Sequence, residues 1–358
     1  MLRKTCALMR TPLRYRPLHC VKAAPNRGLS LKSAAIADTN FQSENALKVR
    51  VFRRPRWFFL SAMLSVLLFW PVFSVIAADG FPLEMRDDRG MTVRLSAPPR
   101  RVVSLAPSLT EIVFLLEKES ALVGVTRFCN YPQVASSLPK VGGMSDPDVE
   151  RIVALSPDLV LCTMDGNSRE RILTLERMGI PCFVIAPQNI HAVFAVIERL
   201  GELLGSARRG RAEVAALARR VEAVRSAVGE RSKAGPRALF VVSTSPIIAA
   251  GSKTFMDELL VLAGARNAAS VFRSRYPRLS VEELVAAGPD VIFVASMSGV
   301  ERFSPEIEGW KEIPALRDGA VFPIDGDLVT RPGPRLVTAL EKVSAILTEL
   351  SSRREENR

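Results

Sequence analysis

A thirteen-residue pattern occurs twice in this chain, and its two copies lie 132 residues apart. The copies are Val149-Glu-Arg-Ile-Val-Ala-Leu-Ser-Pro-Asp-Leu-Val-Leu161 and Val281-Glu-Glu-Leu-Val-Ala-Ala-Gly-Pro-Asp-Val-Ile-Phe293, which are identical at six positions. Each copy has the pattern of a short helix, a Pro-Asp turn and a buried strand. The repeat predicts a chain built from two similar α/β halves, and two similar lobes imply a cleft between them.

Strand-like and helix-like segments alternate in both halves, which is typical of parallel sheets with crossover helices. A hairpin around Asp87-Asp-Arg-Gly90 comes first. The strands expected in the first half are Arg101–Leu105, Leu122–Thr126, Leu159–Thr163 and Cys182–Ala186. Those expected in the second half are Ala238–Val242, Val291–Ala295 and Ala320–Ile324. The predicted fold class is α/β, with two Rossmann-like lobes at residues 79–188 and 235–350 and a charged tail at 351–358.

An almost uninterrupted helical stretch at residues 189–234 separates the two lobes, punctuated at Gly205 and Gly210. Its apolar residues recur at steps of three and four, which places them on one face of a helix: Val214, Leu217, Val221, Val224 and Val228. We therefore expect one long, rigid helix to join the lobes. In the first lobe, Ser108-Leu-Thr-Glu111 matches the capping-box pattern and predicts a helix that begins there.

The positive charge of the chain is concentrated in a leader. Residues 1–56 hold 13 Lys and Arg against Asp38 and Glu44, which accounts for +11 of the net charge of +12. The remainder is close to neutral, so the basic composition does not indicate nucleic-acid binding. We interpret residues 1–50 as a basic leader that results from a misassigned upstream start, with real initiation near Val49 or Val51. The alternative is a basic cytoplasmic tail.

An apolar segment follows the leader. Trp57–Ala78 carries no charge, follows three arginines and ends in small residues, which is the layout of a secretory signal within residues 51–78. Cleavage after Ala77 or Ala78 would release the two-lobed part into the periplasm. Because about 20 apolar residues can also span a bilayer, an uncleaved signal anchor is the alternative. Both interpretations send the main part of the chain across the membrane.

Residues suited to catalysis or metal binding are scarce in the exported part. Its sequence has a single histidine, His191, so a histidine-based triad or a cluster of histidine ligands is not expected. It contains no phosphate-binding loop of the GxxxxGK[ST] type. Its cysteines, Cys129, Cys162 and Cys182, show no metal-binding spacing. We expect no enzyme activity, no catalytic cofactor and no metal site.

Two glutamates stand at matching positions of the repeat. Asp148 and Ser280 align as helix N-caps, which places Glu150 and Glu282 at the second helical position. A carboxylate is favoured there by the helix dipole, and this alone explains each glutamate separately. Helix N-termini lie at the carboxyl edge of the sheet in a doubly wound lobe, so both glutamates would stand on one rim. There they are available to arginines of a two-fold symmetric partner.

Loops that follow strands supply the candidates for ligand binding. Thr126-Arg-Phe-Cys-Asn-Tyr-Pro132 exposes aromatic rings, Arg275-Tyr-Pro-Arg278 precedes the second repeat, and Asp327-Leu-Val-Thr-Arg331 follows the last strand. Aromatic faces with a few polar groups at strand ends are typical of a small-molecule cleft. The alternative is that the proline-containing segments are only stiff turns.

Taken together, these features resemble a substrate-binding protein of an ABC importer, in the helical-backbone class that serves cobalamin, iron–siderophores and haem. The resemblance covers roughly residues 82–350. It rests on Arg101-Val-Val-Ser-Leu-Ala-Pro-Ser-Leu-Thr-Glu111, on the twin Val-Glu…Pro-Asp segments and on Arg331-Pro-Gly-Pro-Arg335. The loops around Phe128 and Arg331 are most similar to those of cobalamin-binding members.

The resemblance implies specific roles for individual residues. Phe128 and Tyr276 correspond to aromatics that contact the corrin ring, and Asp327, Leu328, Val329, Thr330 and Arg331 to the loop that closes on the ligand. Glu150 and Glu282 correspond to glutamates that dock onto arginines of the permease dimer. Met144, also expected at the ligand, and Thr163 replace tryptophans of the enteric cobalamin binder. This poorer aromatic lining leaves a ferric siderophore or haem open as the ligand, with Arg127, Arg275 and Arg278 as partners for an anion.

The expected function is that of a monomeric periplasmic binding protein that captures cobalamin or a related corrinoid and delivers it to an inner-membrane ABC importer. A chelatase-like enzyme on the same scaffold is one alternative, which the lone His191 disfavours. A membrane-anchored sensor or adhesion module that retains Trp57–Ala78 is the other. The stiff connecting helix predicts small lobe movements when ligand binds.

Overall fold

The computed structural model describes residues 80–229, 235–296 and 310–356. All described residues belong to one compact unit. The predicted leader at 1–50 and signal segment at 51–78 lie outside the described residues, as does 230–234 of the predicted connector. Among the helices of the described residues, none is both long and apolar enough to cross a membrane.

A β-hairpin precedes the first lobe, as predicted. Strands β1 (Leu83–Arg86) and β2 (Thr92–Leu95) pair antiparallel. The tip of the hairpin covers the outer edge of a later strand, because the backbone N–H of Asp88 donates to the carbonyl of Val184 at 3.0 Å. The buried Asp87 carboxylate accepts from the Val184 N–H and pairs with Arg89. The hairpin therefore satisfies backbone groups that an exposed sheet edge would leave open.

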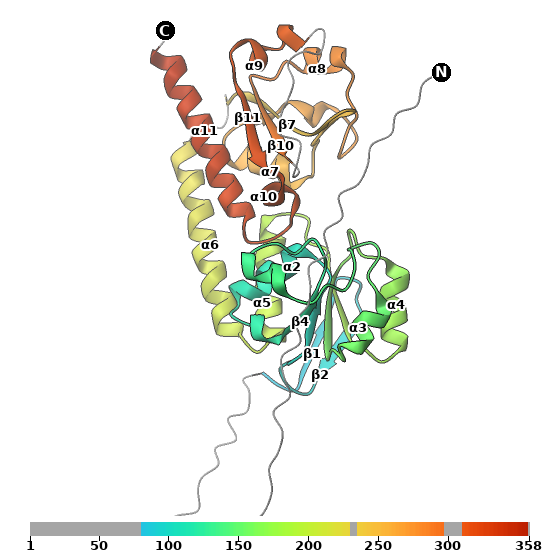
Figure 1. Cartoon of the computed structure of the whole chain (residues 1–358). Helices are drawn as coiled ribbons and strands as arrows, with labels where there is room; N and C mark the ends of the chain where they lie inside the picture. The colour runs from blue at the N-terminus through green and yellow to red at the C-terminus, as the bar shows by residue number, and fades with distance from the viewer. Residues whose placement is uncertain (1–79, 230–234, 297–309, 357–358) are drawn as a thin grey trace, which may run out of the picture. The chain divides into compact units, whose positions relative to one another are not determined.

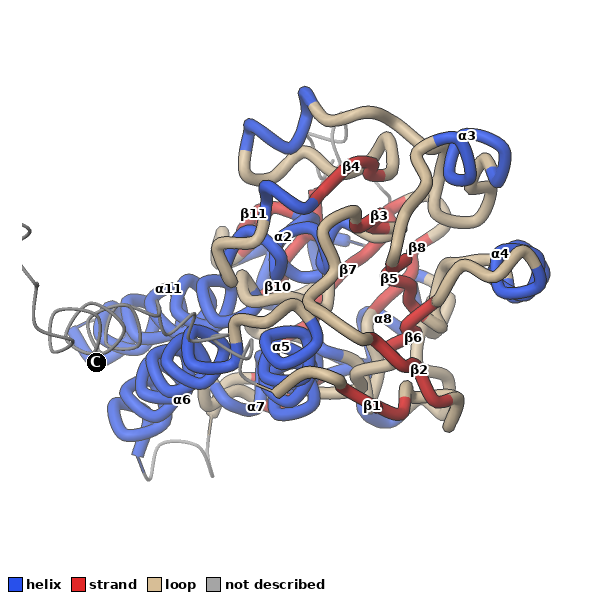
Figure 2. Tube along the Cα trace, turned by 90° about the horizontal axis from the view of Figure 1, so that it is seen from below, coloured by secondary structure: helices blue, strands red, loops and turns tan. Residues whose placement is uncertain are grey.

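The first lobe, the lower one in Figure 1, is built on a parallel sheet with strand order β4-β3-β5-β6 (Figure 2). Its strands are β3 (Val102–Ser104), β4 (Leu122–Val125), β5 (Leu159–Thr163) and β6 (Cys182–Ile185). Its helices are α2 (Pro107–Leu115), α3 (Val149–Ala154) and α4 (Arg169–Arg177), with 3-10 turns at Glu119–Ala121 and Gln133–Ser137. The strands of this lobe agree with the sequence prediction to within one residue.

The predicted capping box at Ser108-Glu111 is wrong. Helix α2 begins at Pro107 after the N-cap residue Ala106, and no side chain caps its first turn. Proline is favoured at the first helical position because its fixed φ suits a helix start, and this sets the boundary before Ser108. The Glu111 side chain is buried and pairs with arginines of the second lobe instead.

The connecting stretch is divided into two helices, α5 (Ile190–Leu203) and α6 (Ala207–Val228), rather than forming one continuous helix. The break falls at Gly205, whose φ of 66° is left-handed and ends α5. Close packing between α5 and α6 is possible because Gly201 and Gly210 face each other without side chains. The 22-residue helix α6 then runs beside the C-terminal helix (Figures 1 and 2).

The second lobe contains a mixed sheet with strand order β11-β10-β7-β8, and β9 pairs with β7 off this path. Its strands are β7 (Arg237–Thr244), β8 (Ile247–Ala249), β9 (Arg266–Asn267), β10 (Val291–Ser296) and β11 (Val321–Asp325). Strands β7, β10 and β11 are parallel, whereas β8 returns antiparallel to β7. The sequence analysis missed β8 because a three-residue strand directly after Pro246 has too few residues to show a periodic pattern.

Helices α7 (Phe255–Leu262), α8 (Val281–Ala287), α9 (Pro314–Arg317), α10 (Gly326–Thr330) and α11 (Leu336–Glu356) complete the second lobe, with 3-10 turns at Ala268–Val271 and Trp310–Glu312. The segment Asp327–Arg331, predicted as a loop, is largely the short helix α10, whose first turn is capped by the Asp325 carboxylate. Helix α11 continues past Leu350 into the predicted tail, where Arg353 pairs with Glu349 one turn earlier at 2.5 Å.

Alternate residues of each sheet pack into different hydrophobic clusters. In the first lobe, Val102, Leu159 and Phe183 face a large cluster, whereas Val103 and Val160 face a second cluster under α3 and α4. In the second lobe, one sheet face packs in the same large cluster and the other under α8 and α9. The large cluster also includes residues of α2, α5, α6, α7 and α11. One continuous core therefore joins the two sheets.

The thirteen-residue repeat adopts the same structure in both lobes, as predicted. Asp148 and Ser280 are the N-caps of α3 and α8, and each helix is followed by an interior strand of its sheet. The aspartate of each Pro-Asp turn accepts a hydrogen bond from the backbone N–H at the start of the lobe's first strand. Arg101 and Arg237, which provide these N–H groups, also donate from their side chains to carbonyls at the end of the repeated helix. The repeat thus preserves a helix–turn–strand unit together with its attachment to the neighbouring strand.

Candidate functional site

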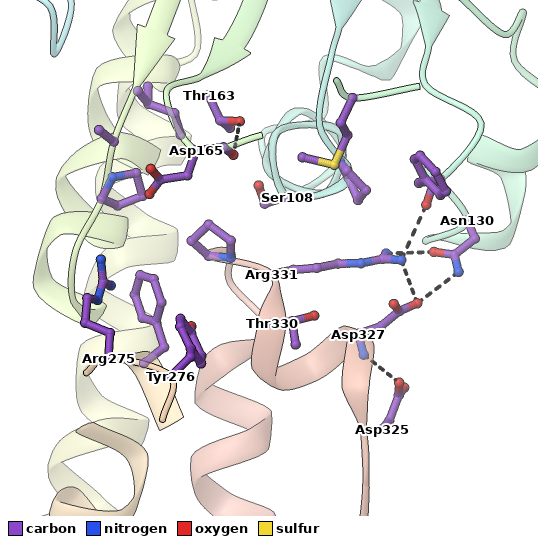
Figure 3. A pocket seen from close by; sticks show the side chains of 18 of the residues that line it. Ser108, Asn130, Thr163, Asp165, Arg275, Tyr276, Asp325, Asp327, Thr330 and Arg331 are labelled. Atoms are coloured by element: carbon purple, nitrogen blue, oxygen red, sulfur yellow. Dashed lines mark hydrogen bonds and ion pairs between the residues drawn. The ribbon is translucent and has the colours of Figure 1, made fainter. Parts of the chain in front are cut away.

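A cleft of about 950 Å³ lies between the two lobes at the carboxyl ends of the strands (Figure 3). The first lobe lines it with Pro107, Ser108, Arg127, Phe128, Asn130, Met144, Thr163, Asp165, Ile185, Ala186 and Pro187. The second lobe contributes Phe255, Arg275, Tyr276, Asp325, Asp327, Thr330, Arg331 and Pro332. Thr163, Ile185 and Asp325 are the last residues of β5, β6 and β11. Ligands of open α/β sheets bind in a crevice outside the carboxyl ends of the strands, which is this edge.

Most of the residues predicted to bind ligand line this cleft. Phe128, Met144, Tyr276, Thr330 and the pair Asp327 and Arg331 are all in its wall. They come from segments far apart in the sequence, and the fold brings them together because each segment follows a strand end or precedes a repeated helix.

Leu328 and Val329 are placed elsewhere. Both are buried in the large hydrophobic cluster, at 5% and 1% exposure, and neither lines the cleft. The reason is that Asp327–Arg331 is helical rather than a loop, so that neighbouring side chains point in different directions around α10. These two residues anchor α10 to the core.

Two aromatic rings flank the cleft, one from each lobe. Phe128 is 46% exposed and Tyr276 is 47% exposed, although large aromatic side chains are usually well buried in a folded domain. The Arg127 guanidinium lies 5.0 Å from the centre of the Phe128 ring, which supports the ring from one side. Exposed aromatic faces in a concave site are suited to a flat, apolar ligand.

Arg331 is the centre of a polar network at the cleft wall (Figure 3). Its guanidinium donates to Asn130 Oδ1 at 2.7 Å and pairs with Asp327 Oδ2 at 2.7 Å. Asn130 Nδ2 donates in turn to Asp327 Oδ2 at 2.9 Å. Glu111 lies behind Arg331 and also binds Arg335. The sequence analysis did not place Asn130, Glu111 or Arg335 in the site, because only the folded chain brings residues about 200 positions apart together.

Some charged side chains of the cleft have ionic partners within the protein, and others do not. Arg127 bonds Asp146 at 3.2 Å, and Arg331 is paired with Asp327 and Glu111. By contrast, among the described residues the side chains of Arg275 and Asp165 have no hydrogen-bonded or ionic partner. Arg275 is therefore a guanidinium available to an anionic group of a ligand.

Within the part of the chain that the structure describes, no group of three His, Cys, Asp or Glu residues is placed to hold a metal. The cysteines Cys129, Cys162 and Cys182 are buried away from the cleft wall, and burial raises the pKa of the Cys162 thiol.

Glu150 and Glu282 are exposed at the second position of α3 and α8. Hydrogen bonds from its own backbone N–H and from the Ser280 hydroxyl lower the pKa of Glu282, so this carboxylate is ionised at neutral pH. Within the described residues, neither glutamate forms an ion pair. Each lobe therefore presents one unpaired carboxylate at the start of its repeated helix.

The chain is similar in sequence to known proteins over most of its length. Residues 102–328 match the sequence model of a family described as periplasmic binding proteins, which covers more than half of the chain. YvrC, an uncharacterised ABC transporter substrate-binding lipoprotein of Bacillus subtilis, is 32% identical over 270 residues, covering 74% of this chain and 85% of the relative. A vitamin B12-binding protein of Vibrio campbellii is 29% identical over 248 residues, covering 69% of this chain and 89% of the relative.

Solved structures show the same fold. A periplasmic haem-binding protein from Pseudomonas aeruginosa superposes with a TM-score of 0.63 at 29% identity, over 70% of this chain and 92% of its own. The α/β architecture with two lobes, predicted from the repeat, is therefore confirmed. The similar proteins are named for vitamin B12 and for haem, so they do not distinguish between these ligands.

Proposed function

The chain belongs to the periplasmic binding protein family, in the class that serves vitamin B12, haem and siderophores, and we propose that it captures cobalamin or a related corrinoid. The observation that carries this proposal is the pair of half-exposed rings, Phe128 and Tyr276, that flank the cleft from opposite lobes. A flat macrocycle held between the lobes would cover both rings. The cleft volume of about 950 Å³ lies near the upper end for small-molecule sites, which favours a large ligand.

Haem or a ferric siderophore is the second candidate, and one observation favours it specifically. Arg275 lines the cleft, and its side chain has no partner among the described residues. An unpaired guanidinium suits a ligand with peripheral carboxylates. Met144 and Thr163 give the first lobe a less aromatic wall than tryptophans would, which also weakens the case for a corrin.

Calorimetric titration distinguishes the two candidates. Purified protein is titrated in parallel with cyanocobalamin, haemin and a ferric hydroxamate, and the proposal predicts one-to-one binding of cyanocobalamin that is tighter than binding of the others. Tight binding of haemin or the hydroxamate, with no heat from cyanocobalamin, would replace the corrinoid with the second candidate.

We further propose that Glu150 and Glu282 dock onto positive residues of a permease dimer. Substrate-binding proteins of ABC importers work with a permease, and one exposed, unpaired carboxylate per lobe suits a partner with two similar halves. A Glu150→Ala, Glu282→Ala variant should bind ligand like the wild type but no longer stimulate transport. Glu170→Ala is the matched control, because Glu170 is also a glutamate at the second position of a helix, α4, but lies outside the repeat. Equal transport by the double variant and the wild type would remove this role.

The family and its relatives indicate an extracytoplasmic location, and we propose the periplasm after cleavage at Ala77 or Ala78. The named relatives are substrate-binding proteins, and we propose that this chain likewise has no catalytic function and acts as a monomer. Sequencing the N-terminus of the exported protein tests the location. A first residue before Arg53 would contradict the cleavage and support retention of the segment.

A further inference from the structure

A buried carboxylate of the first lobe is enclosed by two arginines of the second. Glu111 lies on α2, and its side chain is only 1% exposed. Arg335 donates to it through Nε at 3.0 Å and through Nη2 at 2.7 Å, and Arg331 Nη1 lies 3.3 Å from Oε1. The arginine side chains are themselves mostly buried, at 16% and 12% exposure. All three bonds join the two lobes, since the partners are 220 and 224 residues apart.

A second layer of contacts surrounds this ion pair. Arg331 also donates to Asn130 of the first lobe, and Asn130 donates to Asp327 of the second (Figure 3). The Arg335 guanidinium lies 4.1 Å from the centre of the Tyr131 ring, so a cation–π contact adds to the attachment. Both lobes therefore contribute to every level of the network.

The backbone of the segment that carries both arginines lies directly against α2. A Cβ atom at Gly333 would lie 3.4 Å from the Cβ of Ser108 and 3.5 Å from Oε2 of Glu111. These are ordinary van der Waals distances, so the segment packs directly on α2, and from it Arg331 and Arg335 reach the same carboxylate. The network is thus built into the contact between the lobes rather than formed by long side chains that reach across a gap.

Because the Glu111 carboxylate is buried, removal of one charged partner of the network should lower the stability of the protein strongly. Burial by itself lowers the pKa of the Arg335 guanidinium, but its hydrogen bonds and charge attraction to Glu111 outweigh this effect and raise the pKa. Removing one partner of a buried pair leaves an uncompensated charge in a low-dielectric environment, whereas removing both can be nearly neutral. Single and double variants therefore separate two effects. One is the loss of stability caused by an unpaired buried charge, and the other is the loss of the bonds that hold the lobes together.

We propose that Glu111, Arg331 and Arg335 form an interlobe clamp that sets the width of the cleft and holds the Arg331 guanidinium at its wall. Glu111 does not line the cleft, so it is a positioning residue that acts through Arg331 and Arg335. Arg331, Asn130 and Asp327 do line it, so a change in the clamp changes the shape of the site. The clamp is a property of the chain alone and holds for whichever ligand the cleft takes.

The distance between the lobes tests the clamp without any ligand. In full-length protein with Cys6→Ser and Cys20→Ser, spin labels are attached at Glu170→Cys on α4 and Arg273→Cys in the second lobe, both exposed positions. Pulsed electron spin resonance then gives the distribution of the distance between the labels. We expect a narrow distribution for the wild-type clamp and a clearly broader or longer one for Glu111→Gln.

The matched control is Glu341→Gln. Glu341 binds Arg220 through the same two guanidinium nitrogens, at 2.8 and 2.7 Å, but this pair is partly exposed and links α6 to α11. Its loss should leave the distribution unchanged. A distribution that broadens equally in Glu111→Gln and Glu341→Gln would show that the effect is not specific to the clamp and would overturn the proposal.

A double variant covers the case in which Glu111→Gln folds poorly. Glu111→Gln with Arg335→Gln leaves neither charge of the bidentate pair buried alone, so its thermal unfolding should recover towards the wild type. Its label distances should nevertheless stay broad, and amide hydrogens of residues 127–131 and 326–335 should exchange about tenfold faster or more than in the wild type. Narrow distances with unchanged exchange in a folded double variant would refute the clamp.

Discussion

Replacing Tyr276 by alanine should weaken ligand binding by an amount that follows from its exposure. The residue is 47% exposed at the cleft wall, so a ligand that covers the ring removes about 100 Å² of surface from water, given about 200 Å² for a large aromatic side chain. At about 20 to 25 cal/mol per Å² this contributes about 2 to 2.5 kcal/mol. Each 1.4 kcal/mol changes affinity about tenfold, so Tyr276→Ala should raise Kd by roughly 30- to 60-fold.

The assay is calorimetric titration with whichever ligand the wild-type protein binds. Tyr276→Phe keeps the ring and should stay within about threefold of the wild type, because the area of the face is unchanged. Val271→Ala is the matched control, since Val271 is 78% exposed in the preceding turn but does not line the cleft. A Kd for Tyr276→Ala within about threefold of the wild type would refute the idea that this face is covered by ligand.

Further predictions concern the core and its titratable groups. Leu328→Ala should lower the free energy of unfolding by about 3 kcal/mol in denaturant titrations, because Leu328 is buried in the core; a change below about 1 kcal/mol would contradict that placement. Burial raises the pKa of Glu258 above its ordinary 4.5, so the folded protein favours the protonated side chain. The stability gained from this protonation is fully present below the ordinary pKa and is lost as pH rises through the raised pKa. In Glu258→Gln the side chain stays neutral at every pH. Calorimetric scans should therefore show that this variant unfolds at no lower a temperature than the wild type at neutral pH, and at the same temperature in acid. A variant that is less stable than the wild type only at neutral pH would contradict the raised pKa of Glu258. Thiol reagents should modify the buried cysteines only after the protein unfolds, and rapid modification of the native protein would contradict their burial: Cys129, Cys162 and Cys182.

The sequence was most informative where a local pattern decides the structure. The repeat predicted α3 and α8, their N-caps Asp148 and Ser280, and the strands that follow them. These features depend on residues within about ten positions of each other, so propensity, capping and burial all act on a short segment. The boundaries of the lobes remain predictions.

The errors occur where a distant contact overrides the local pattern. Ser108 and Glu111 have the spacing of a capping box, but Glu111 is held by Arg331 and Arg335 from the other lobe, and Pro107 sets the helix start. No local rule identifies a partner 224 residues away. The same limit explains why Asn130 was not assigned to the site.

The sequence predicted that the region between the lobes is helical, but it did not predict the division into α5 and α6. Gly205 was recognised as punctuation, but a glycine within a helical pattern can be tolerated, so the pattern alone did not predict a break. Its left-handed φ of 66° and the close approach of Gly201 to Gly210 make α5 and α6 separate, closely packed helices. Similarly, the cap that Asp325 provides turns Asp327–Arg331 into α10, which directs Leu328 and Val329 into the core.

The central claim is that one ligand is held between both lobes in the cleft flanked by Phe128 and Tyr276. Hydrogen exchange of the protein with and without a saturating amount of the ligand that it binds in the calorimetric titration tests this most directly, because it maps protection along the chain. The account predicts slower exchange in residues 127–131 of the first lobe together with residues 275–276 and 326–332 of the second. Protection confined to one lobe, or no change in any of these segments, would contradict it.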